Sequence, residues 1–258
     1  MTKRLIWADS LRGILIVLVV LGHAIQAQLG DDCFNDHLWN YIYSFHMAAF
    51  MAVSGWLSCR VGSQMNRSGG GRLTTVYRRI QQLLIPLFLW SVLKFITLKV
   101  SPSNEVFNVF HPDPYYWFLW ALFCIQTFFI IGDWLSEFIK LKQYVAIASV
   151  WVLLVLLMLV LNVRILGFQY IAYYFAFYII GYYLHKYESL LIKNKVFLLL
   201  LMLVWPVLAW FWDMHELPLS ILPLTGGLLQ YAYRFVTALL AVYVLINATP
   251  MLLDSGKK

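Results

Sequence analysis

The chain has 258 residues, of which 62% are hydrophobic and 12% are charged, and its mean hydropathy is +0.75. A soluble domain of this length has no use for so much apolar surface, so we expect an all-α, polytopic integral membrane protein. A net charge of +7 is compatible with nucleic-acid binding, but the basic residues gather in alternate loops, as membrane topology requires. We therefore predict no nucleic-acid partner.

The apolar segments predict a bundle of about eight transmembrane helices. Pro86 lies inside the third of these helices and predicts a kink, and Pro206 lies inside the seventh. Between the second and third, residues 62–75 are rich in glycine and lack the G-K-[ST] of a phosphate-binding loop, so we expect a mobile basic loop. In chain order, the predicted helices cover residues 11–29, 38–59, 80–99, 115–132, 144–162, 168–185, 196–212 and 228–247.

Charged residues between these helices alternate in sign and indicate the orientation in the bilayer. The basic set is Lys3, Arg4, Arg60, Arg67, Arg72, Arg78, Arg79, Lys140, Lys142, Lys186, Lys193, Lys195, Lys257 and Lys258. The opposite set is Asp31, Asp32, Asp36, Glu105, Asp113, Asp213 and Glu216, with a lone Arg164. Basic loops remain in the cytoplasm, so both termini are predicted to be cytoplasmic.

The first helix carries a polar residue at each end of its apolar run, Arg12 and His23. Eleven helical steps leave the two side chains roughly 20° apart around the axis and about 16 Å apart in depth. Asp9 lies one turn before Arg12, close to the same face. Polar residues inside a membrane are costly and usually face a cavity or partner helices, which favours a functional stripe. The alternative is that Arg12 extends to the head groups while His23 is a satisfied packing residue.

The second helix adds His46, which this antiparallel arrangement places at a depth similar to that of His23. One interpretation is that each histidine bonds a neighbouring carbonyl. The other is a shared polar pocket, in which a histidine could transfer protons because its ordinary pKa is near neutrality. Since no carboxylate accompanies the two histidines, we predict no metal site.

Two further groups are candidates for substrate binding. Trp117 and Trp120 open the fourth helix, where they form either an interfacial aromatic belt or rings that stack on a sugar. Arg78 and Arg79 lie near the predicted inner end of the third helix, with Arg60 at the end of the second. Those arginines either determine topology or dock a phosphate-bearing cytoplasmic donor.

Several of these segments resemble the membrane acyltransferase 3 family, with the first two helices closest to its fucose 4-O-acetyltransferase-like branch. The resemblance covers most of residues 5–185, and its first two motifs together are fairly specific. The motifs are Asp9-Ser-Leu-Arg12-Gly13 with Leu21-Gly22-His23, Phe45-His46-Met47 with Phe50 and Ser54-Gly55-Trp56-Leu57, Arg79 with Leu84-Ile85-Pro86, Trp117-Phe118-Leu119-Trp120, and Phe177-Tyr178-Ile179-Ile180-Gly181-Tyr182.

The resemblance implies a multi-pass O-acyltransferase of the bacterial cytoplasmic membrane. Such enzymes move an acyl group, commonly acetyl, from cytoplasmic acyl-CoA to a hydroxyl of a surface carbohydrate or glycolipid. His23 would act as general base or acyl relay, supported by Arg12 and Asp9, with acetyl-CoA as donor and no metal.

Family members usually continue with further helices and a late Gly-x-x-Ser/Thr segment. This sequence ends at Lys258, about where that segment should begin. We therefore expect residues 1–258 to form a single transmembrane domain that is shortened at its C-terminus. A proton-coupled transporter that uses Arg12, His23 and His46, or an inactive shortened relative, are the alternatives.

Overall fold

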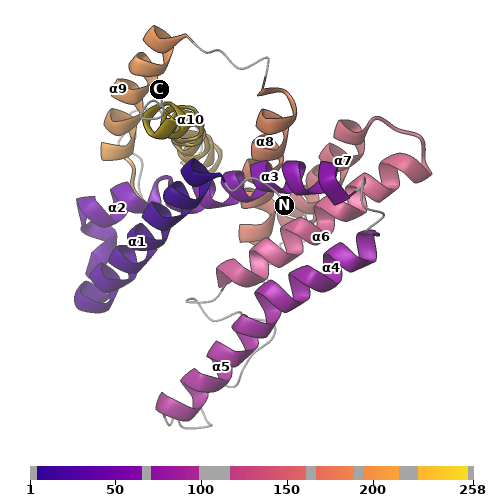
Figure 1. Ribbon diagram of the computed structural model, residues 1–258. Coiled ribbons are helices and arrows are strands. Elements are labelled where there is room, and N and C mark those ends of the chain that lie inside the picture. Colours follow the sequence, from indigo (N-terminus) through magenta and orange to yellow (C-terminus); the bar gives the residue numbers. More distant parts are fainter. Residues whose placement is uncertain are drawn as a thin grey trace. The chain divides into compact units, whose positions relative to one another are not determined.

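The protein was analysed as a computed structural model that describes residues 5–65, 71–98, 117–160, 167–188, 194–214 and 226–254 (Figure 1). These residues are almost entirely helical, and they include no strand. In chain order the elements are α1 (Ile6–Leu29), the 3₁₀-helix η1 (Gly30–Asn35), α2 (His37–Tyr43), α3 (His46–Met65), α4 (Arg72–Arg79), the π-helix η2 (Ile80–Leu84), α5 (Ile85–Leu98), α6 (Trp117–Phe138), α7 (Gln143–Val160), α8 (Phe168–Lys186), α9 (Lys195–Trp210) and α10 (Gly226–Asp254).

Within the part of the chain that the structure describes, five stretches are long and apolar enough to cross a membrane. They are Ile6–Asn35, His37–Arg60, Trp117–Phe138, Gln143–Val160 and Leu229–Leu252. Lys195–Trp210 is a shorter apolar helix. The expectation of a helical membrane protein is thus confirmed, while eight spans and cytoplasmic termini stay predictions. Ten of the charged residues used to orient the chain lie outside the described residues: Lys3, Arg4, Arg67, Glu105, Asp113, Arg164, Lys193, Glu216, Lys257 and Lys258.

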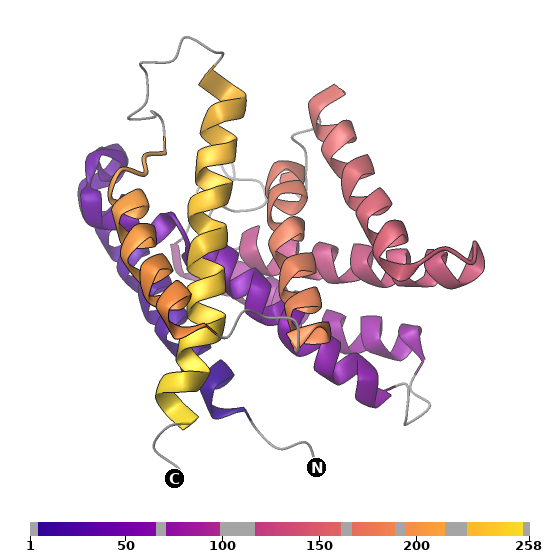
Figure 2. The same ribbon diagram turned by 90° about the horizontal axis from the view of Figure 1, so that it is seen from above.

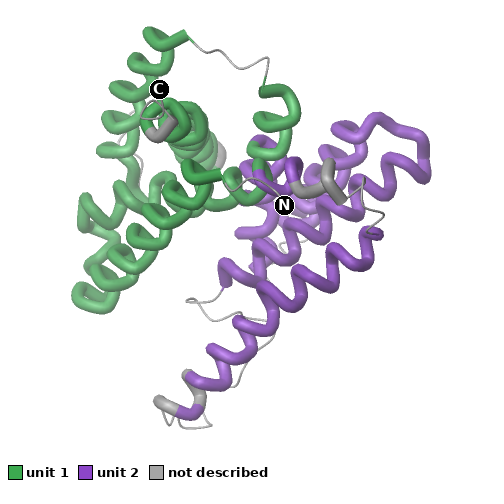
Figure 3. The backbone as a smooth tube through the Cα atoms, viewed as in Figure 1, with its two compact units in different colours: residues 1–56, 181–258 green, residues 57–180 purple. Residues whose placement is uncertain are grey.

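The chain divides into two compact units (Figure 3). Unit 1 comprises residues 1–56 and 181–258, and unit 2 comprises residues 57–180. The divisions fall inside α3 and α8, so each of these helices contributes one part to each unit.

In unit 1, α10 packs against α9 and α1, and α2 packs against α1 and α9 (Figure 2). The first half of α3 is the most enclosed part of the unit, because every residue from Ser44 to Trp56 except Phe50 is buried. Gly181 of α8 lies directly on the backbone of Ala52. A Cβ added to this glycine would lie 2.8 Å from Ala52 Cα and closer still to its carbonyl. Only glycine permits this backbone approach.

One end of unit 1 is closed by an aromatic cluster of Cys33, Trp39 and Trp212. Arg234 of α10 holds the chain that follows α9 against this cluster. Its Nε and Nη2 donate to the carbonyl of Asp213 at 3.1 and 2.8 Å, and its guanidinium lies 5.4 Å from the centroid of the Trp212 ring. Burial of large rings supplies most of the packing energy at this end.

In unit 2, α6 and α7 form a tight antiparallel hairpin. Gly132 allows the close approach, because an added Cβ would lie 3.1 Å from Ile147 Cα. The connection between the two helices contains Lys140 at φ 57°, a left-handed conformation that non-glycine residues seldom adopt. The first part of α8 joins the unit through Trp151 Nε1, which donates to the carbonyl of Ala172 at 2.9 Å.

The second predicted helix is not continuous, contrary to expectation, and is interrupted at Ser44 and Phe45. Two side chains compete for carbonyls at this point. Ser44 Oγ donates to the carbonyl of Tyr41 at 2.7 Å, and the imidazole of His46 bonds the carbonyl of Ile42 at 2.7 Å. Side-chain bonds to nearby carbonyls offer the backbone an alternative to the regular ladder.

The segment before the third predicted helix also differs from expectation. Residues 62–65 and 72–75 of the predicted loop are helical, and only residues 66–70 lie outside the described part. The helical rod then passes through π-helical η2, which ends two residues before Pro86. A wider π turn accommodates the ring and the missing N–H of a proline within a helix. The kink itself stays a prediction.

The orientation can be tested by labelling single cysteines. With Cys33, Cys59 and Cys124 replaced by alanine, we expect a cysteine at Ser63 to react from the cytoplasmic side and one at Asn35 from the outside. The measurement is mass-shift labelling by an impermeant maleimide, in intact cells and in inverted vesicles. Labelling of both positions in intact cells would contradict the orientation.

Candidate active site

The candidate residues of helix α1 lie at the edge of its packed side. Ala8, Leu11, Leu15 and Gly22 are buried, and they mark one stripe along the helix. Arg12 and His23 are half-buried and lie at the edge of this stripe, whereas residues 13, 14, 16, 17, 20 and 21 are exposed. Asp9 is also half-buried, one turn before Arg12. Arg12 and His23 thus lie between the packed and the exposed sides of α1, and their functional role stays a prediction.

His23 and His46 both belong to unit 1. The side chain of His23 hydrogen-bonds Gln26, three residues further along α1. The ring of Tyr43 lies against His46 and against Gly22, the residue directly before His23. This ring therefore links two candidates that are 23 positions apart in the sequence.

The surroundings of His46 determine which ring nitrogen is available for chemistry. The side chain is only 2% exposed, and its Nδ1 lies 2.7 Å from the carbonyl of Ile42. Because a carbonyl only accepts, Nδ1 carries the proton, and in the neutral ring the lone pair lies on Nε2. The carbonyl interpretation is thus confirmed for one nitrogen of His46, and the other can accept a proton or a hydrogen bond.

The two tryptophan candidates belong to unit 2, at the start of α6. Trp117 is stacked on Tyr174, with centroids 5.5 Å apart, and its centroid lies 4.6 Å from that of Tyr170. Trp120 lies 6.2 Å from Phe123. Both tryptophans are half-buried. Trp117 is therefore part of an aromatic cluster shared by α6 and α8. A ligand that stacks on Trp117 would lie close to Tyr170 and Tyr174.

The arginine candidates belong to unit 2 as well. Arg78 is exposed at the end of α4, and half-buried Arg79 donates to Gln82 Oε1 at 3.2 Å. The guanidinium of Arg79 also interacts electrostatically with Tyr178 of α8. Arg12 belongs to unit 1, so the predicted phosphate-docking set is divided between the units.

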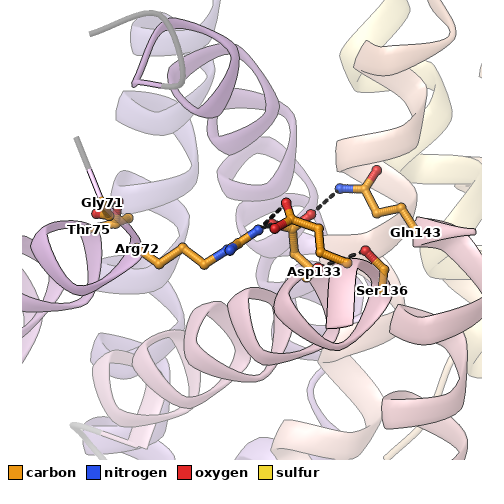
Figure 4. A network of polar contacts seen from close by, with 7 residues as sticks. Gly71, Arg72, Thr75, Asp133, Ser136 and Gln143 are labelled. Atoms are coloured by element: carbon orange, nitrogen blue, oxygen red, sulfur yellow. Dashed lines mark hydrogen bonds and ion pairs between the residues drawn. The ribbon is translucent and has the colours of Figure 1, made fainter. Parts of the chain in front are cut away.

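A polar network that the sequence analysis did not anticipate fixes the start of α4 to the end of α6 (Figure 4). Arg72 donates to Asp133 Oδ2 through Nε at 3.3 Å and through Nη2 at 3.1 Å, and it forms an ion pair with Glu137. Gln143 donates to the other carboxylate oxygen of Asp133, Oδ1, at 2.7 Å. The pKa of Arg72 is raised, first by the hydrogen bond to Glu137. The signal was present in the sequence as two acidic residues four positions apart at a helix end.

The described residues contain no group of three or more His, Cys, Asp or Glu that could hold a metal ion. The candidate residues supply imidazole, guanidinium and carboxylate groups. These support proton transfer at a histidine and binding of an anionic group at an arginine.

Comparison with known proteins identifies the family and two relatives. The model of the acyltransferase 3 family, described as an acyltransferase domain, matches residues 5–254. Nodulation protein NolL of Mesorhizobium japonicum is 34% identical over 158 residues, which are 55% of this chain and 38% of the relative. NolL of Sinorhizobium fredii is 34% identical over 160 residues, 54% of this chain and 40% of the relative. The chain thus spans about two-fifths of the curated relatives that it matches. No solved structure matches it.

Proposed function

We propose that this chain, which belongs to the acyltransferase 3 family, transfers an acyl group, in the first place acetyl, from cytoplasmic acyl-CoA to a hydroxyl of a carbohydrate or glycolipid. The proposal places the protein in the bacterial cytoplasmic membrane as a multi-pass enzyme. Acetyl-CoA is the donor substrate, and no metal takes part.

The observation that carries the proposal is the pair Arg12 and His23, half-buried on one face of α1 beside its buried residues. A half-buried arginine and a half-buried histidine on one membrane helix are costly, and such residues usually serve substrates or proton transfer. Their separation, about 16 Å, suits a donor whose phosphates bind at Arg12 while its thioester reaches towards His23.

In the proposed reaction His23 takes the proton from the acceptor hydroxyl, and the oxygen attacks the thioester carbonyl carbon. The carbon–sulfur bond then breaks, the acyl group stays on the acceptor as an oxygen ester, and the proton returns from His23 to the departing thiolate. His46 supports His23, while Asp9 orients the guanidinium of Arg12. Trp117 and Trp120 offer ring surface to a sugar, and Arg78 and Arg79 attract the phosphates of the donor.

The experiment that tests the function supplies radiolabelled acetyl-CoA and a lipid-linked oligosaccharide to membranes that contain the chain. We expect the label in an alkali-labile ester, above the level in membranes from cells with an empty vector. Label that crosses the membrane without forming an ester would support the transporter instead. Absence of both ester and transport would contradict each function.

Arg12 is expected to act on the donor side. Arg12→Ala should raise KM for acetyl-CoA about tenfold or more, because hydrogen bonds to charged groups contribute about 1.5–3 kcal/mol. Arg12→Lys should restore only part of the loss, since lysine keeps the charge but lacks the bidentate fork. The measurement is initial rate against donor concentration, and an unchanged donor KM in Arg12→Ala would refute the role.

A further inference from the structure

Tyr43 occupies the point where α1, α2 and α3 meet in unit 1. It is the last residue of α2, directly before the interruption that separates α2 from α3. Its ring stacks on Trp39, with centroids 3.8 Å apart and an interplanar angle of 18°. The ring also meets His46 edge to face, with centroids 4.7 Å apart and an angle of 70°. Both rings against which it packs are nearly fully buried.

The other side of Tyr43 rests on α1 at Gly22, the residue directly before His23. A Cβ added to Gly22 would lie 2.8 Å from Tyr43 Cε2, closer than real Cβ contacts come. Gly22 lies within a regular helix, where glycine is less favourable than alanine. Glycine is therefore required at position 22 because the ring of Tyr43 occupies the space that a side chain would need.

These contacts connect the two histidines through one ring. Tyr43 touches His46 directly and touches the α1 backbone beside His23, while Trp39 limits its movement from the opposite side. We propose that Tyr43 is a positioning residue that fixes the His46 imidazole relative to His23, and that Gly22 exists to admit its ring. The proposal deepens the acyl-transfer function and rests on it. The ring carries the role, because Tyr43 makes these contacts through ring atoms.

The test compares Tyr43→Phe, Tyr43→Ala, Gly22→Ala and the double variant. Misplacement of reacting groups by about 1 Å reduces rates up to about 100-fold, so we expect Tyr43→Ala and Gly22→Ala each to lower kcat about tenfold or more, with KM for acetyl-CoA unchanged. Tyr43→Phe should stay within about twofold of wild type, because it keeps the ring. In the Tyr43→Ala background, Gly22→Ala should cause no further loss, since the ring it displaces is already absent.

A second readout does not depend on acyl transfer. Diethyl pyrocarbonate modifies accessible neutral imidazoles, and mass spectrometry of peptides gives separate rates for His23 and His46. We expect Tyr43→Ala and Gly22→Ala to increase the rate at His46 severalfold and Tyr43→Phe to leave both rates unchanged. Tyr41→Ala is the matched control. Tyr41 lies on the same helix, and its ring packs against Phe45 and Trp205.

The two readouts separate failure of this proposal from failure of the proposed function. A wild-type chain without transferase activity would refute the function, and the histidine modification rates would still test Tyr43. Additive losses in the double variant, or wild-type modification rates in both single variants, would overturn the positioning role. If Tyr43→Ala does not accumulate in the membrane, Tyr43→Leu provides an apolar replacement for the same comparisons.

Discussion

Replacing His23 with alanine is expected to abolish acyl transfer while the protein stays in the membrane at its wild-type amount. Removal of a general base typically lowers a rate about 100- to 10,000-fold. Alanine is fully compatible with a membrane helix, so the half-buried position tolerates the change. The measurement is ester formation from radiolabelled acetyl-CoA, normalised to the amount of protein by immunoblot. His46→Ala should have a smaller effect, because one nitrogen of that ring is already bound to the Ile42 carbonyl.

The matched control is His37→Ala. His37 is exposed at the start of α2 and stacks on Trp210, with centroids 5.0 Å apart. Since its ring is exposed and packs on Trp210 of α9, we expect unchanged transfer. Wild-type activity in His23→Ala, or equal losses in His23→Ala and His37→Ala, would refute the proposed mechanism. The family assignment would stand in either case.

The largest expected effect on stability is that of Gly181→Ala. A Cβ at this position would lie 2.8 Å from Ala52 Cα, and backbone atoms of α3 cannot rotate away as a flexible side chain could. Overpacking of this kind costs typically 1–3 kcal/mol, and occasionally more. We therefore expect a clearly lower thermal denaturation midpoint in detergent and reduced accumulation in the membrane.

Gly227→Ala serves as the control for Gly181→Ala. Gly227 is exposed near the start of α10, and a Cβ added there would meet nothing within 4 Å. Alanine favours a helix more than glycine does, so this variant should be as stable as wild type or slightly more stable. Equal midpoints for the two alanine variants would contradict the close approach of α8 to α3.

Hydropathy predicted the location of the helices well, because burial in lipid requires long apolar segments with satisfied backbones. It did not predict the interruption at Ser44 and Phe45. That feature depends on the hydroxyl of Ser44 and the imidazole of His46 taking carbonyls of the preceding turn. A hydropathy window averages over such local competition.

For the candidate site, the 3.6-residue helical period predicted which residues share a face of one helix. It could not predict which residues of different helices make contact. The spacing of Arg12 and His23 predicted a common face, and this face lies beside the buried residues of α1. The Arg72–Asp133 pair, in contrast, joins residues 61 positions apart. Arg72 was interpreted only as a topology signal. The distribution of charge along the sequence does not show which acidic residue pairs with it.

The left-handed conformation of Lys140 has a consequence for how this protein is made. Glycine would adopt φ 57° without penalty, whereas an ordinary side chain costs roughly 1–2 kcal/mol there. Glycine would also remove one of the two lysines that flank the turn, Lys140 and Lys142. Orientation is decided while helices enter the bilayer, when cationic turns are retained on the cytoplasmic side and the final fold does not yet exist. In the predicted orientation, with this turn on the cytoplasmic side, the finished hairpin keeps a small permanent strain from a lysine whose charge acts during insertion.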